Sequence, residues 1–412
     1  MSVIRTAILG FGTVGEGVYR TIKTHQQELK EVLGAEVEVS AVLVQNEQKE
    51  RKVDKGILVT TNFEEILKLP QLDIVFEAIV GKEPSFSYLK EALVAGCHII
   101  TANKEMFAEH GQELLDSADR QGARVGFEAT VAGGVPIIQI LQQLLRVNNL
   151  ETIQGILNGT SNFILTEMRD KQLSFEDALA LAQEKGFAEA DSGNDIHGFD
   201  AYYKTKILSQ VAFGEQPETS SFQVAGISGV TIEQIEVAER LGLRFKHVTE
   251  LKREKGQVQA SVQPVLVSPS HPFYHVEGVD NAVNVTTDLV GSLTLQGPGA
   301  GMLPTASAMV EDLVHVWHRP LLKFGKQQEK EHLETRQQDG NASYWLVSNL
   351  REKSFLKELD YYSEYTGNIH VVKAKEVELE KLKASDREVL AYPIVADQLF
   401  ESKLEQTEVH VY

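Results

Sequence analysis

A glycine-rich turn near the start of the chain constrains the fold more than any other feature. Residues 4–9 form a short apolar run with β-branched residues, and the sequence GFGTVG at residues 10–15 follows directly. A helical stretch over residues 14–33 comes next and stops at Gly34, a residue type that commonly ends helices. A strand, a G-x-G-x-x-G turn and a helix in this order predict a parallel α/β domain that binds a dinucleotide at the helix N-terminus.

The three glycines of this turn have separate tasks. Gly10 makes the tight turn, Gly12 lets backbone N–H groups approach a pyrophosphate, and Gly15 allows the helix to pack closely on the strand. A G-x-G-x-x-G sequence is a weak signal on its own. Its position between a strand and a helix makes the prediction of dinucleotide binding specific.

The end of the second predicted strand, residues 37–44, bears on which nicotinamide cofactor binds. An acid there would bind the ribose hydroxyls of NAD, whereas a base would accept the 2′-phosphate of NADP. The chain has Gln45 and no acid at this point, and three bases follow: Lys49, Arg51 and Lys52. The pattern favours NADP, with NAD possible, and a solvated loop is the alternative interpretation of these bases.

A later strand end carries a lysine suited to a ligand. Residues 97–101, CHIIT, follow the apolar strand predicted at residues 73–79 and lead into the sequence TANK at residues 101–104. Ligands of open α/β sheets bind beyond the carboxyl ends of the strands, so Lys104 is a candidate contact for cofactor or substrate. An exposed loop lysine is the alternative. Cys97 and His98 begin the same strand at its far end and are predicted to be core residues.

The next strand end, the sequence EATVAGGVP at residues 128–136, consists of small residues and two adjacent glycines. An irregular backbone of this kind leaves carbonyl oxygens unpaired, and hard cations such as Na⁺ or Ca²⁺ take oxygen ligands. The residues alone favour the simpler interpretation, a glycine hinge between two domains.

A polar stretch at residues 186–204, GFAEADSGNDIHGFDAYYK, contains four acids and ends in a lysine. Residues 191–198 are typical of a loop, because Ser, Asn and Asp side chains bond their own backbone. A helix is predicted from about residue 199, which places Asp200 and Lys204 on one helix face. Taken alone, this spacing is typical of a solvated ion pair. The functional alternative makes Lys204 an acid/base.

The following region predicts a second domain of mixed α/β type with an antiparallel sheet. Its β-rich stretches are residues 244–251, 258–267, 282–287 and 290–295, and Lys255-Gly256 suggests a hairpin turn. A second glycine-rich turn, GPGAG at residues 297–301, precedes a helix over residues 304–317. It is either a tight turn or a place where backbone approaches the cofactor.

Composition excludes several classes of partner and site. The chain has 59 acids and 40 bases, a net charge of −19, which argues against nucleic acid and anionic membranes as partners. Cys97 is the single cysteine, so an internal disulfide and a cysteine metal cluster are excluded. No apolar run approaches the roughly 18 residues that span a bilayer, and the N-terminus lacks a signal-peptide pattern. These features predict a cytoplasmic protein.

Taken together, the segments resemble homoserine dehydrogenase. The match extends from Gly10 to about Val316, and six segments occur in the order and at the spacings of that family: GFGTVG, TANKEMF, EATVAGGVPII, NGTSNFIL, GFAEADSGNDIHGFDAYYKTKIL and GPGAG. The resemblance implies reversible NAD(P)H-dependent reduction of L-aspartate 4-semialdehyde to L-homoserine, in threonine and methionine biosynthesis. It also implies a homodimer formed through the substrate domain.

The resemblance implies a role for each matching residue. Lys204 is the implied acid/base, Asp200 its helical partner in the site, and Glu189 a substrate ligand. Lys104 would lie between cofactor and substrate. The residues implied to contact the pyrophosphate are Gly12, Thr13 and Val14, with Gly301 approaching from the second glycine turn. The residues implied to hold a structural Na⁺ through their oxygens are Glu128, Val131, Gly133 and Val135. Asp191 and Asp195 remain loop residues.

The predicted organisation has three parts. Residues 1–135, completed by about 300–320, form a Rossmann-type nucleotide-binding domain, and residues 136–300 form an α/β substrate-binding and dimerisation domain. Residues 335–412 are similar to a small α+β ACT regulatory domain, with strands at 342–350, 368–373, 388–394 and 407–412 and helices at 353–362 and 397–403. The Asp-x-Pro-Gly turn common in such domains is replaced by NLREK at residues 349–353, which argues against threonine inhibition.

Two other functions are alternatives to this one. An aldehyde-oxidising dehydrogenase needs a cysteine thiolate, and Cys97 is predicted at the wrong end of its strand. A non-catalytic dinucleotide-sensing protein would keep the glycines but would have no need of Lys204 or Glu189.

Overall fold

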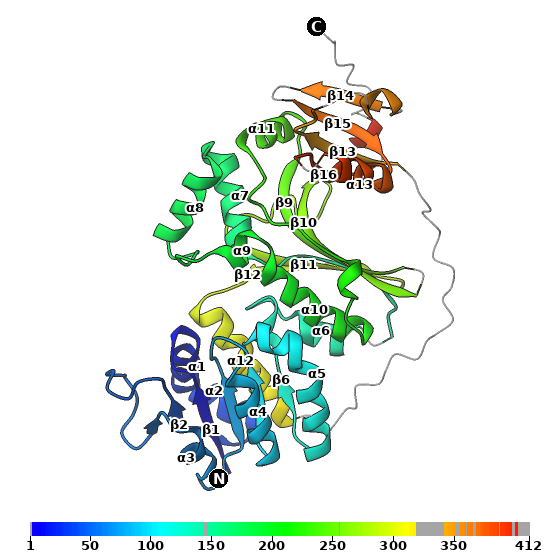
Figure 1. The fold of residues 1–412 in the computed structure, drawn as a ribbon. Coiled ribbons are helices and arrows are strands. Elements are labelled where there is room, and N and C mark those ends of the chain that lie inside the picture. Colours follow the sequence, from blue (N-terminus) through cyan, green and yellow to red (C-terminus); the bar gives the residue numbers. More distant parts are fainter. Residues whose placement is uncertain are drawn as a thin grey trace. The chain divides into compact units, whose positions relative to one another are not determined.

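The computed structural model describes residues 2–143, 145, 147–254, 256–318, 342–351, 355–359, 361–365, 368–386, 388–397 and 400–402. Over these residues the chain forms two compact units (Figure 1). Unit 1 combines the chain up to Leu150 with Tyr203–Gln216 and the segment that begins at Gly297. Unit 2 combines Glu151–Tyr202 with Pro217–Gln296 and the described residues from 342 onward. Helix α10, Phe199–Phe213, contributes residues to both.

The sheet of unit 1 has the doubly wound order β3-β2-β1-β4-β5-β6, and its neighbouring strands are parallel. Its strands are β1 Val3–Leu9, β2 Glu36–Leu43, β3 Leu58–Thr60, β4 Ile74–Glu77, β5 His98–Thr101 and β6 Val125–Gly126. This order reverses direction between β1 and β4, which is where such sheets bind dinucleotides. The predicted Rossmann-type fold is confirmed.

Helices complete unit 1. They are α1 Thr13–Thr24, α2 Gln26–Leu33, α3 Phe63–Leu67, α4 Ser85–Val94, α5 Lys104–Gln121, α6 Ile137–Gln143 and α12 Met302–His318, with a 3₁₀ turn at Glu128–Thr130. The helix predicted over residues 14–33 is interrupted at His25, whose φ of −117° and ψ of 30° are not helical. Gly34 ends α2 with a φ of 66°, as predicted. Helices α1, α2 and α12 share one apolar core with β1, β2 and β4.

Unit 2 is built on a second sheet of order β12-β11-β7-β9-β10-β16-β13-β15-β14, with β8 paired to β10. Its strands are β7 Leu150–Ile156, β8 Phe222–Val224, β9 Arg244–Glu254, β10 Gln257–Val267, β11 Asp280–Thr287, β12 Gly291–Pro298, β13 Ser343–Ser348, β14 Tyr361–Tyr365, β15 Ile369–Ala374 and β16 Leu390–Val395. The predicted antiparallel hairpin between β9 and β10 is confirmed. Gly256 at its turn has a φ of 81°, which favours glycine.

The helices of unit 2 surround this sheet. They are α7 Gly159–Lys171, α8 Phe175–Glu184, α9 Gly193–Ile196, α11 Ile232–Arg240 and α13 Glu376–Ser385, with 3₁₀ turns at Thr219–Ser221 and Phe355–Glu358. The short helix α9 lies inside the stretch predicted as a loop. Thr231 caps α11 through a capping box with Gln234.

The C-terminal module, which we define as the described residues from 342 onward, differs in part from its prediction. The helix predicted at 353–362 is wrong, since a 3₁₀ turn occupies Phe355–Glu358 and β14 begins at Tyr361. Aromatic residues at 361 and 362 favour a strand there. Helix α13 was not predicted. The strand predicted at 407–412 and part of the helix at 397–403 lie outside the described residues. Identity with an ACT domain stays a prediction.

The C-terminal module is built into the sheet of unit 2. Strand β16 pairs in parallel with the end of β10 through Leu266 and Val267. Along β13, Tyr344 and Leu346 join an apolar core with α7, α8, α11 and β9, while the alternate side chains join a second core under α13. Strand periodicity places successive side chains on opposite faces, so both faces of β13 are covered.

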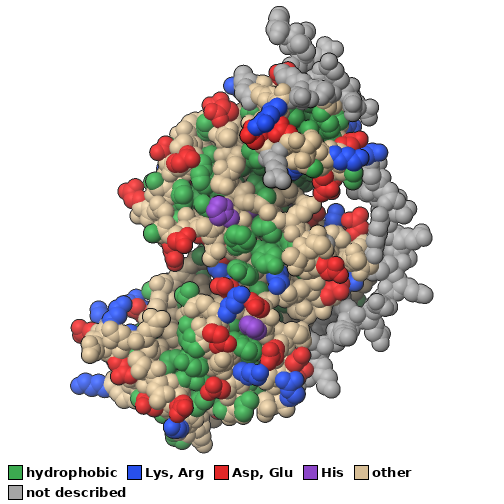
Figure 2. Space-filling view, viewed as in Figure 1, with side chains coloured by type: hydrophobic (Ala, Val, Ile, Leu, Met, Phe, Trp, Pro, Cys, Tyr) green, Lys and Arg blue, Asp and Glu red, His purple; other side chains and the backbone are tan. Residues whose placement is uncertain are grey.

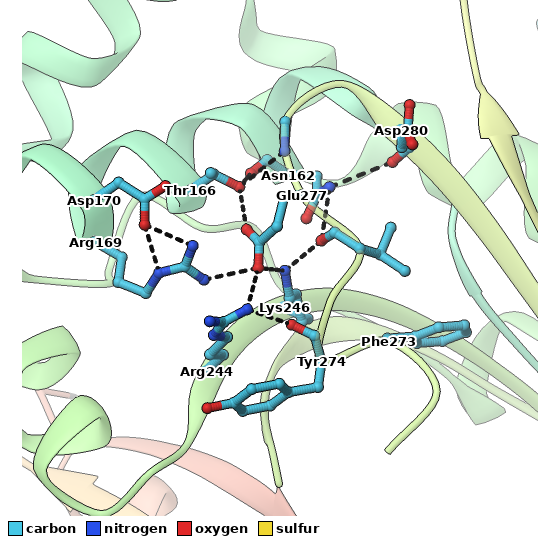
Figure 3. A network of polar contacts seen from close by, with 12 residues as sticks. Asn162, Thr166, Arg169, Asp170, Arg244, Lys246, Phe273, Tyr274, Glu277 and Asp280 are labelled. Carbon is cyan, nitrogen blue, oxygen red and sulfur yellow. Dashed lines mark hydrogen bonds and ion pairs between the residues drawn. The ribbon is translucent and has the colours of Figure 1, made fainter. Parts of the chain in front are cut away.

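A network of polar contacts anchors α7 in unit 2 (Figure 3). Glu277 Oε1 accepts hydrogen bonds from Nη1 of Arg169 at 2.9 Å and Nη1 of Arg244 at 2.7 Å, and lies 3.2 Å from Nζ of Lys246. Its Oε2 accepts from Thr166 Oγ1 at 2.9 Å. Burial would raise the pKa of Glu277, but Arg169 and Lys246 bring it below its usual value. The network therefore joins α7 to β9 and to the segment before β11.

Replacing Glu277 with Gln should lower the free energy of unfolding by about 2–4 kcal/mol, because three cations would then share a neutral amide. Lys246 is 1% exposed and cannot regain water without moving. Glu236→Gln, at an exposed ion pair with N and O atoms 3.9 Å apart, is the matched control and should change stability by less than about 0.5 kcal/mol. Urea unfolding measures both. Equal effects of the two variants would contradict the importance of the network.

Candidate active site

The glycine turn has the geometry that the sequence predicts. Gly10 has a φ of +88°, and a Cβ there would lie 2.6 Å from the carbonyl oxygen of Ala78. A Cβ on Gly15 would lie 1.9 Å from the oxygen of Gly10, so α1 can approach β1 only without a side chain at this position. A Cβ on Gly12, by contrast, would meet nothing within 4 Å. The turn is thus tightly packed beneath Gly12 and open at Gly12 itself.

The N-terminus of α1 is available to an anion. Gly12 occupies the cap position and has no side chain to accept from the first helical N–H groups, which belong to Thr13, Val14 and the residues after them, and among the described residues no other side chain is seen to do so. Helix N-termini of this kind bind phosphate. A Cβ on Gly17 would lie 2.9 Å from the oxygen of Met302, so the start of α12 and its neighbour Gly301 lie against α1. The structure therefore brings the two predicted glycine turns into one region.

Of the three bases in the loop after β2 that favour NADP, one is bound by backbone carbonyl oxygens of the loop itself. Arg51 donates to the carbonyl oxygens of Asn46 and Lys49 at 2.7 and 2.8 Å, within its own loop. Gln45 is exposed. Lys49 and Lys52 are exposed as well.

A buried carboxyl group that the sequence did not single out organises the TANK segment. Glu77, at the end of β4, accepts hydrogen bonds from Thr101 Oγ1 at 2.5 Å and from the N–H of Ile79 at 2.7 Å. Burial raises the pKa of this carboxyl, and these donors oppose the rise. Asn103 caps α5 through Met106 and donates to the oxygen of Gly81 at 2.7 Å. Lys104, half-buried, is the first residue of α5.

The loop after β6 is fixed by Glu128, which is 2% exposed. Its two carboxylate oxygens each accept a backbone N–H of α6 at 2.8 Å, from Ile138 and Gln139. Its own N–H donates to Asp312 Oδ2 on α12 at 2.8 Å. Burial, and then the charge of Asp312, raise the pKa of Glu128 to about 8; burial raises the pKa of Asp312 to about 7. The pair therefore titrates near neutrality.

The same loop contains the residues that are predicted to hold a hard cation. The described residues contain no cluster of three or more His, Cys, Asp or Glu side chains placed for a metal, so an ion here would depend on carbonyl oxygens. Val131 is buried, and no described backbone N–H donates to its oxygen or to that of Gly133. A Cβ on Gly133 would lie 2.3 Å from the oxygen of Gly299, which explains why the loop needs glycine there.

Helix α10 carries the predicted acid/base pair in buried positions. Asp200 is 3% exposed and Lys204 is 8% exposed, one helical turn further on. Burial of both side chains excludes the solvated surface pair that spacing alone suggested. Glu189, the predicted substrate ligand, is exposed between α8 and α9, and its carbonyl oxygen accepts from Gln183 Nε2 at 3.2 Å.

Asn158 connects two carboxylates, one of which sequence reasoning left as a loop residue. Its Nδ2 donates to Asp195 Oδ1 at 2.7 Å and to Asp200 Oδ2 at 2.9 Å. Asp195 therefore lies beside Asp200. The available signal was the sequence NGTSN at residues 158–162, in which Asn158 caps α7. His247 on β9 is also close to Asp200, and burial lowers its pKa against the effect of that carboxylate.

Cys97 is a core residue, as predicted, whereas His98 is only half-buried. Cys97 is 1% exposed, and its Sγ donates to the oxygen of Leu72 at 3.3 Å. Burial raises the pKa of its thiol to about 11, so a nucleophilic thiolate is not available at neutral pH. His98 Nδ1 accepts the N–H of Arg124 at 3.1 Å. The aldehyde-oxidising alternative therefore has no nucleophile.

Comparison with known proteins agrees with this geometry. A family model described as "Homoserine dehydrogenase, NAD binding domain" matches residues 10–128, and one described as "Homoserine dehydrogenase" matches residues 136–314. The homoserine dehydrogenase of Bacillus subtilis is 41% identical over 373 residues, which cover 90% of this chain and 82% of that relative. The chain belongs to the homoserine dehydrogenase family.

Solved structures of the family extend the comparison. A homoserine dehydrogenase from Thiobacillus denitrificans superposes with a TM-score of 0.85 at 34% identity, covering 96% of this chain and 99% of that one. A hyperthermophilic archaeal homoserine dehydrogenase in complex with NADPH superposes with a TM-score of 0.66 at 29% identity, covering 76% of this chain and 97% of that one.

Membership of the homoserine dehydrogenase family establishes the general activity. The chain is an oxidoreductase that acts on a CH–OH group in amino-acid biosynthesis, and its first domain binds a nicotinamide dinucleotide. Within the described ranges, no helix combines the length and apolar character that a membrane crossing requires.

Asp312→Asn should make the homoserine dehydrogenase more stable at alkaline pH. Both carboxyls of the Glu128–Asp312 pair have folded pKa values, about 8 and 7, above those of free carboxyls near 4. The folded state therefore holds protons that the unfolded state has lost, and stability falls as pH rises from about 4 towards 8. The variant should match wild type near pH 5 and exceed it by about 2 kcal/mol at pH 8.5, measured by urea unfolding. A difference independent of pH would contradict the prediction.

Proposed function

We propose that this chain catalyses the reversible reduction of L-aspartate 4-semialdehyde to L-homoserine by NADPH, as a step towards threonine and methionine. The observation that carries the proposal is the burial of Asp200 and Lys204 one turn apart on α10. Surface ion pairs stay hydrated, whereas an acid/base must be shielded from competing water. The open N-terminus of α1 supports a bound dinucleotide.

Lys204 is the proposed proton carrier. NADPH, when bound, supplies the hydride to the aldehyde carbon. Negative charge then grows on the carbonyl oxygen, which Lys204 stabilises and protonates. Asp200 orients the lysine through their shared helix face. Glu189 and Lys104 bind the substrate, and Lys104 also meets the cofactor.

NADP is the proposed cofactor, with NAD as the alternative. The end of β2 is followed by Gln45 in place of the acid that would bind the ribose hydroxyls, and Lys49 and Lys52 are exposed in the loop beyond it. The bound NADPH of the archaeal relative supports the same choice. The proposed contacts to the pyrophosphate come from the glycine turn, residues 10–15, with Gly301 from the second turn.

A structural Na⁺ is the proposed ligand of the loop after β6. The ligands would be oxygens of Glu128, Val131, Gly133 and Val135. No described backbone N–H donates to the carbonyl oxygens of Val131 and Gly133, which supports these two as ligands, whereas the oxygen of Val135 accepts the N–H of Ile137 at 2.9 Å. Such an ion would hold the loop against the second glycine turn, where Gly134 donates to the oxygen of Pro298 at 3.0 Å.

The remaining parts of the proposal concern assembly and location. We propose a homodimer formed through the substrate domain, residues 136–300, a regulatory role for the C-terminal module, and action in the cytoplasm on small molecules. On the face shown in Figure 2, basic side chains are interspersed with acidic ones, which supports a small-molecule rather than a nucleic-acid partner.

Lys204→Ala should abolish turnover while leaving NADPH binding within about threefold of wild type, because the lysine acts on the substrate and not on the pyrophosphate. Turnover is followed by nicotinamide absorbance with homoserine or aspartate semialdehyde, and binding by NADPH fluorescence. The exposed Lys185→Ala is the control and should behave as wild type. If wild type shows no homoserine-dependent signal with either cofactor, the chain senses dinucleotides without turnover. Loss of binding as well as turnover in Lys204→Ala would indicate a structural role.

Homoserine oxidation should accelerate as pH rises, because Lys204 must be neutral to accept the alcohol proton. A free lysine titrates near about 10.4, so the gain should extend across pH 7–10. Aldehyde reduction, which needs the protonated amine, should change in the opposite sense. Initial rates in both directions across this range test the assignment. A flat oxidation profile would remove Lys204 as the base.

A further inference from the structure

The orientation of the Asn158 amide is fixed by its surroundings. Its Oδ1 accepts the N–H of Ser161 at 2.7 Å, which caps α7. A backbone N–H can only donate, so the oxygen must face it and the NH₂ group must face the other way. There it meets Asp195 and Asp200, whose oxygens can accept both of its hydrogens. An amide flipped by 180° would lose all three hydrogen bonds.

The two carboxylates that share this amide come from separate elements. Asp195 lies in the short helix α9, and Asp200 is the second residue of α10. Ser161 Oγ also donates to the backbone oxygen of Asp195 at 3.0 Å, so the first turn of α7 holds α9 by main chain and side chain. Asn158 is 4% exposed, which makes its hydrogen bonds stronger than they would be in water.

Helix α7 is itself immobilised along one face, which carries Gly159, Asn162, Thr166 and Arg169. Asn162 Nδ2 donates to the oxygens of Val276 and Asp280 at 3.3 Å, and Thr166 and Arg169 bind Glu277 (Figure 3). A Cβ on Gly159 would lie 2.6 Å from the oxygen of Val279. The position of the Asn158 amide is therefore set by contacts over the length of the helix.

We propose that Asn158 is a positioning residue for the reaction: it holds Asp195 and Asp200 at a fixed separation and so aligns Asp200 with Lys204 on α10. This inference rests on the roles given above to Asp200 and Lys204. Without the amide, the two carboxylates would lose the donor that they share, their repulsion would grow, and Asp200 would turn away from its catalytic orientation. Misplacement by about 1 Å is enough to lower rates by about 100-fold.

Asn158→Asp is the sharpest test, because it separates positioning from capping. Aspartate caps helices as well as asparagine does, so α7 should remain intact. In this variant, a carboxylate replaces the NH₂ group that donates to Asp195 and Asp200, so three carboxylates lie together. At pH 8 we expect kcat/KM to fall about 100-fold, mainly in kcat, with NADPH binding close to wild type. Urea stability should fall at this pH, because a third buried carboxylate faces Asp195 and Asp200, but the variant should remain folded.

The pH profile of this variant supplies a readout that a capping role would not change. Three adjacent carboxyls bind a proton more readily than one, and the protonated group can again donate a hydrogen bond. Near pH 5.5, kcat/KM of the variant should therefore be only about 10-fold below that of wild type. Other titratable groups near Asp200 include His247 on β9 and Lys204 on the same helix. Both are present in wild type, so the ratio of kcat/KM in the variant to that in wild type isolates the effect of the substitution.

Two further variants complete the experiment. Asn62 caps α3 through the N–H of Glu64 and is exposed, so Asn62→Asp is the same substitution at a plain cap and should keep wild-type kinetics. Asn158→Ser keeps a cap but has no amide, and should lose activity without recovering it at low pH.

Each outcome decides the proposal. Wild-type kcat/KM in Asn158→Asp at pH 8, or a deficit equal at all pH values, overturns it. If that variant does not fold, Asn158→Ser decides: full activity overturns the proposal and a loss with intact NADPH binding supports it. A wild-type enzyme without homoserine turnover would remove the proposed function, and the positioning role with it.

Discussion

The close backbone contact between Gly10 and Gly15 is the constraint on which unit 1 depends. Any side chain at Gly15 would overlap the carbonyl oxygen of Gly10, so the distance between α1 and β1 is set by the absence of a Cβ. The same device recurs where Gly17 meets Met302 and where Gly133 meets Gly299. These contacts join α1 to β1 and to the start of α12, and join the loop after β6 to the second glycine turn. The cofactor site is therefore assembled by backbone packing, and its open part is the end of α1.

Unit 2 is held together differently. Hydrogen bonds and ion pairs position α7, and the close backbone approach at Gly159 adds to them at one end of the helix. Three cations on two elements converge on Glu277, and the amide groups of Asn158 and Asn162 reach neighbouring segments at one end of the helix. Polar networks in a low-dielectric interior specify geometry strictly, since a displaced donor leaves an unsatisfied acceptor. The positions of Asp195 and Asp200, which accept from Asn158, are therefore fixed as well.

The sequence predicted the features that depend on local pattern. The strand, turn and helix at residues 4–33, the hairpin at Gly256 and the helix that carries Asp200 and Lys204 all follow from residue order. Contacts between distant segments could not be predicted in the same way. Glu77 and Asp312 lie in apolar runs that look like ordinary buried elements, and only the folded chain shows their partners. Asp195 was missed because a loop composition conceals which of its acids faces inward.

The C-terminal module also shows a limit of pattern reading. In its first strand, Tyr344 and Leu346 face one core, and Trp345 and Val347 face another. This alternation of apolar residues predicts a strand that is covered on both faces, but it does not predict which elements cover it. The residues of α13 are good helix formers, yet the prediction placed its helices on either side of them.

The pairing of β16 with β10 has a consequence for how a chain of this family can shorten. Leu266 and Val267 lie at the end of β10, and both are buried where β16 runs beside them. A chain that stopped before β13 would leave this segment as an uncovered edge next to the apolar surface of α11. Exposed edges of that kind recruit strands from other molecules and lead to aggregation. Evolutionary loss of the C-terminal module would therefore require new polar or charged residues along β10 and α11 in the same lineage.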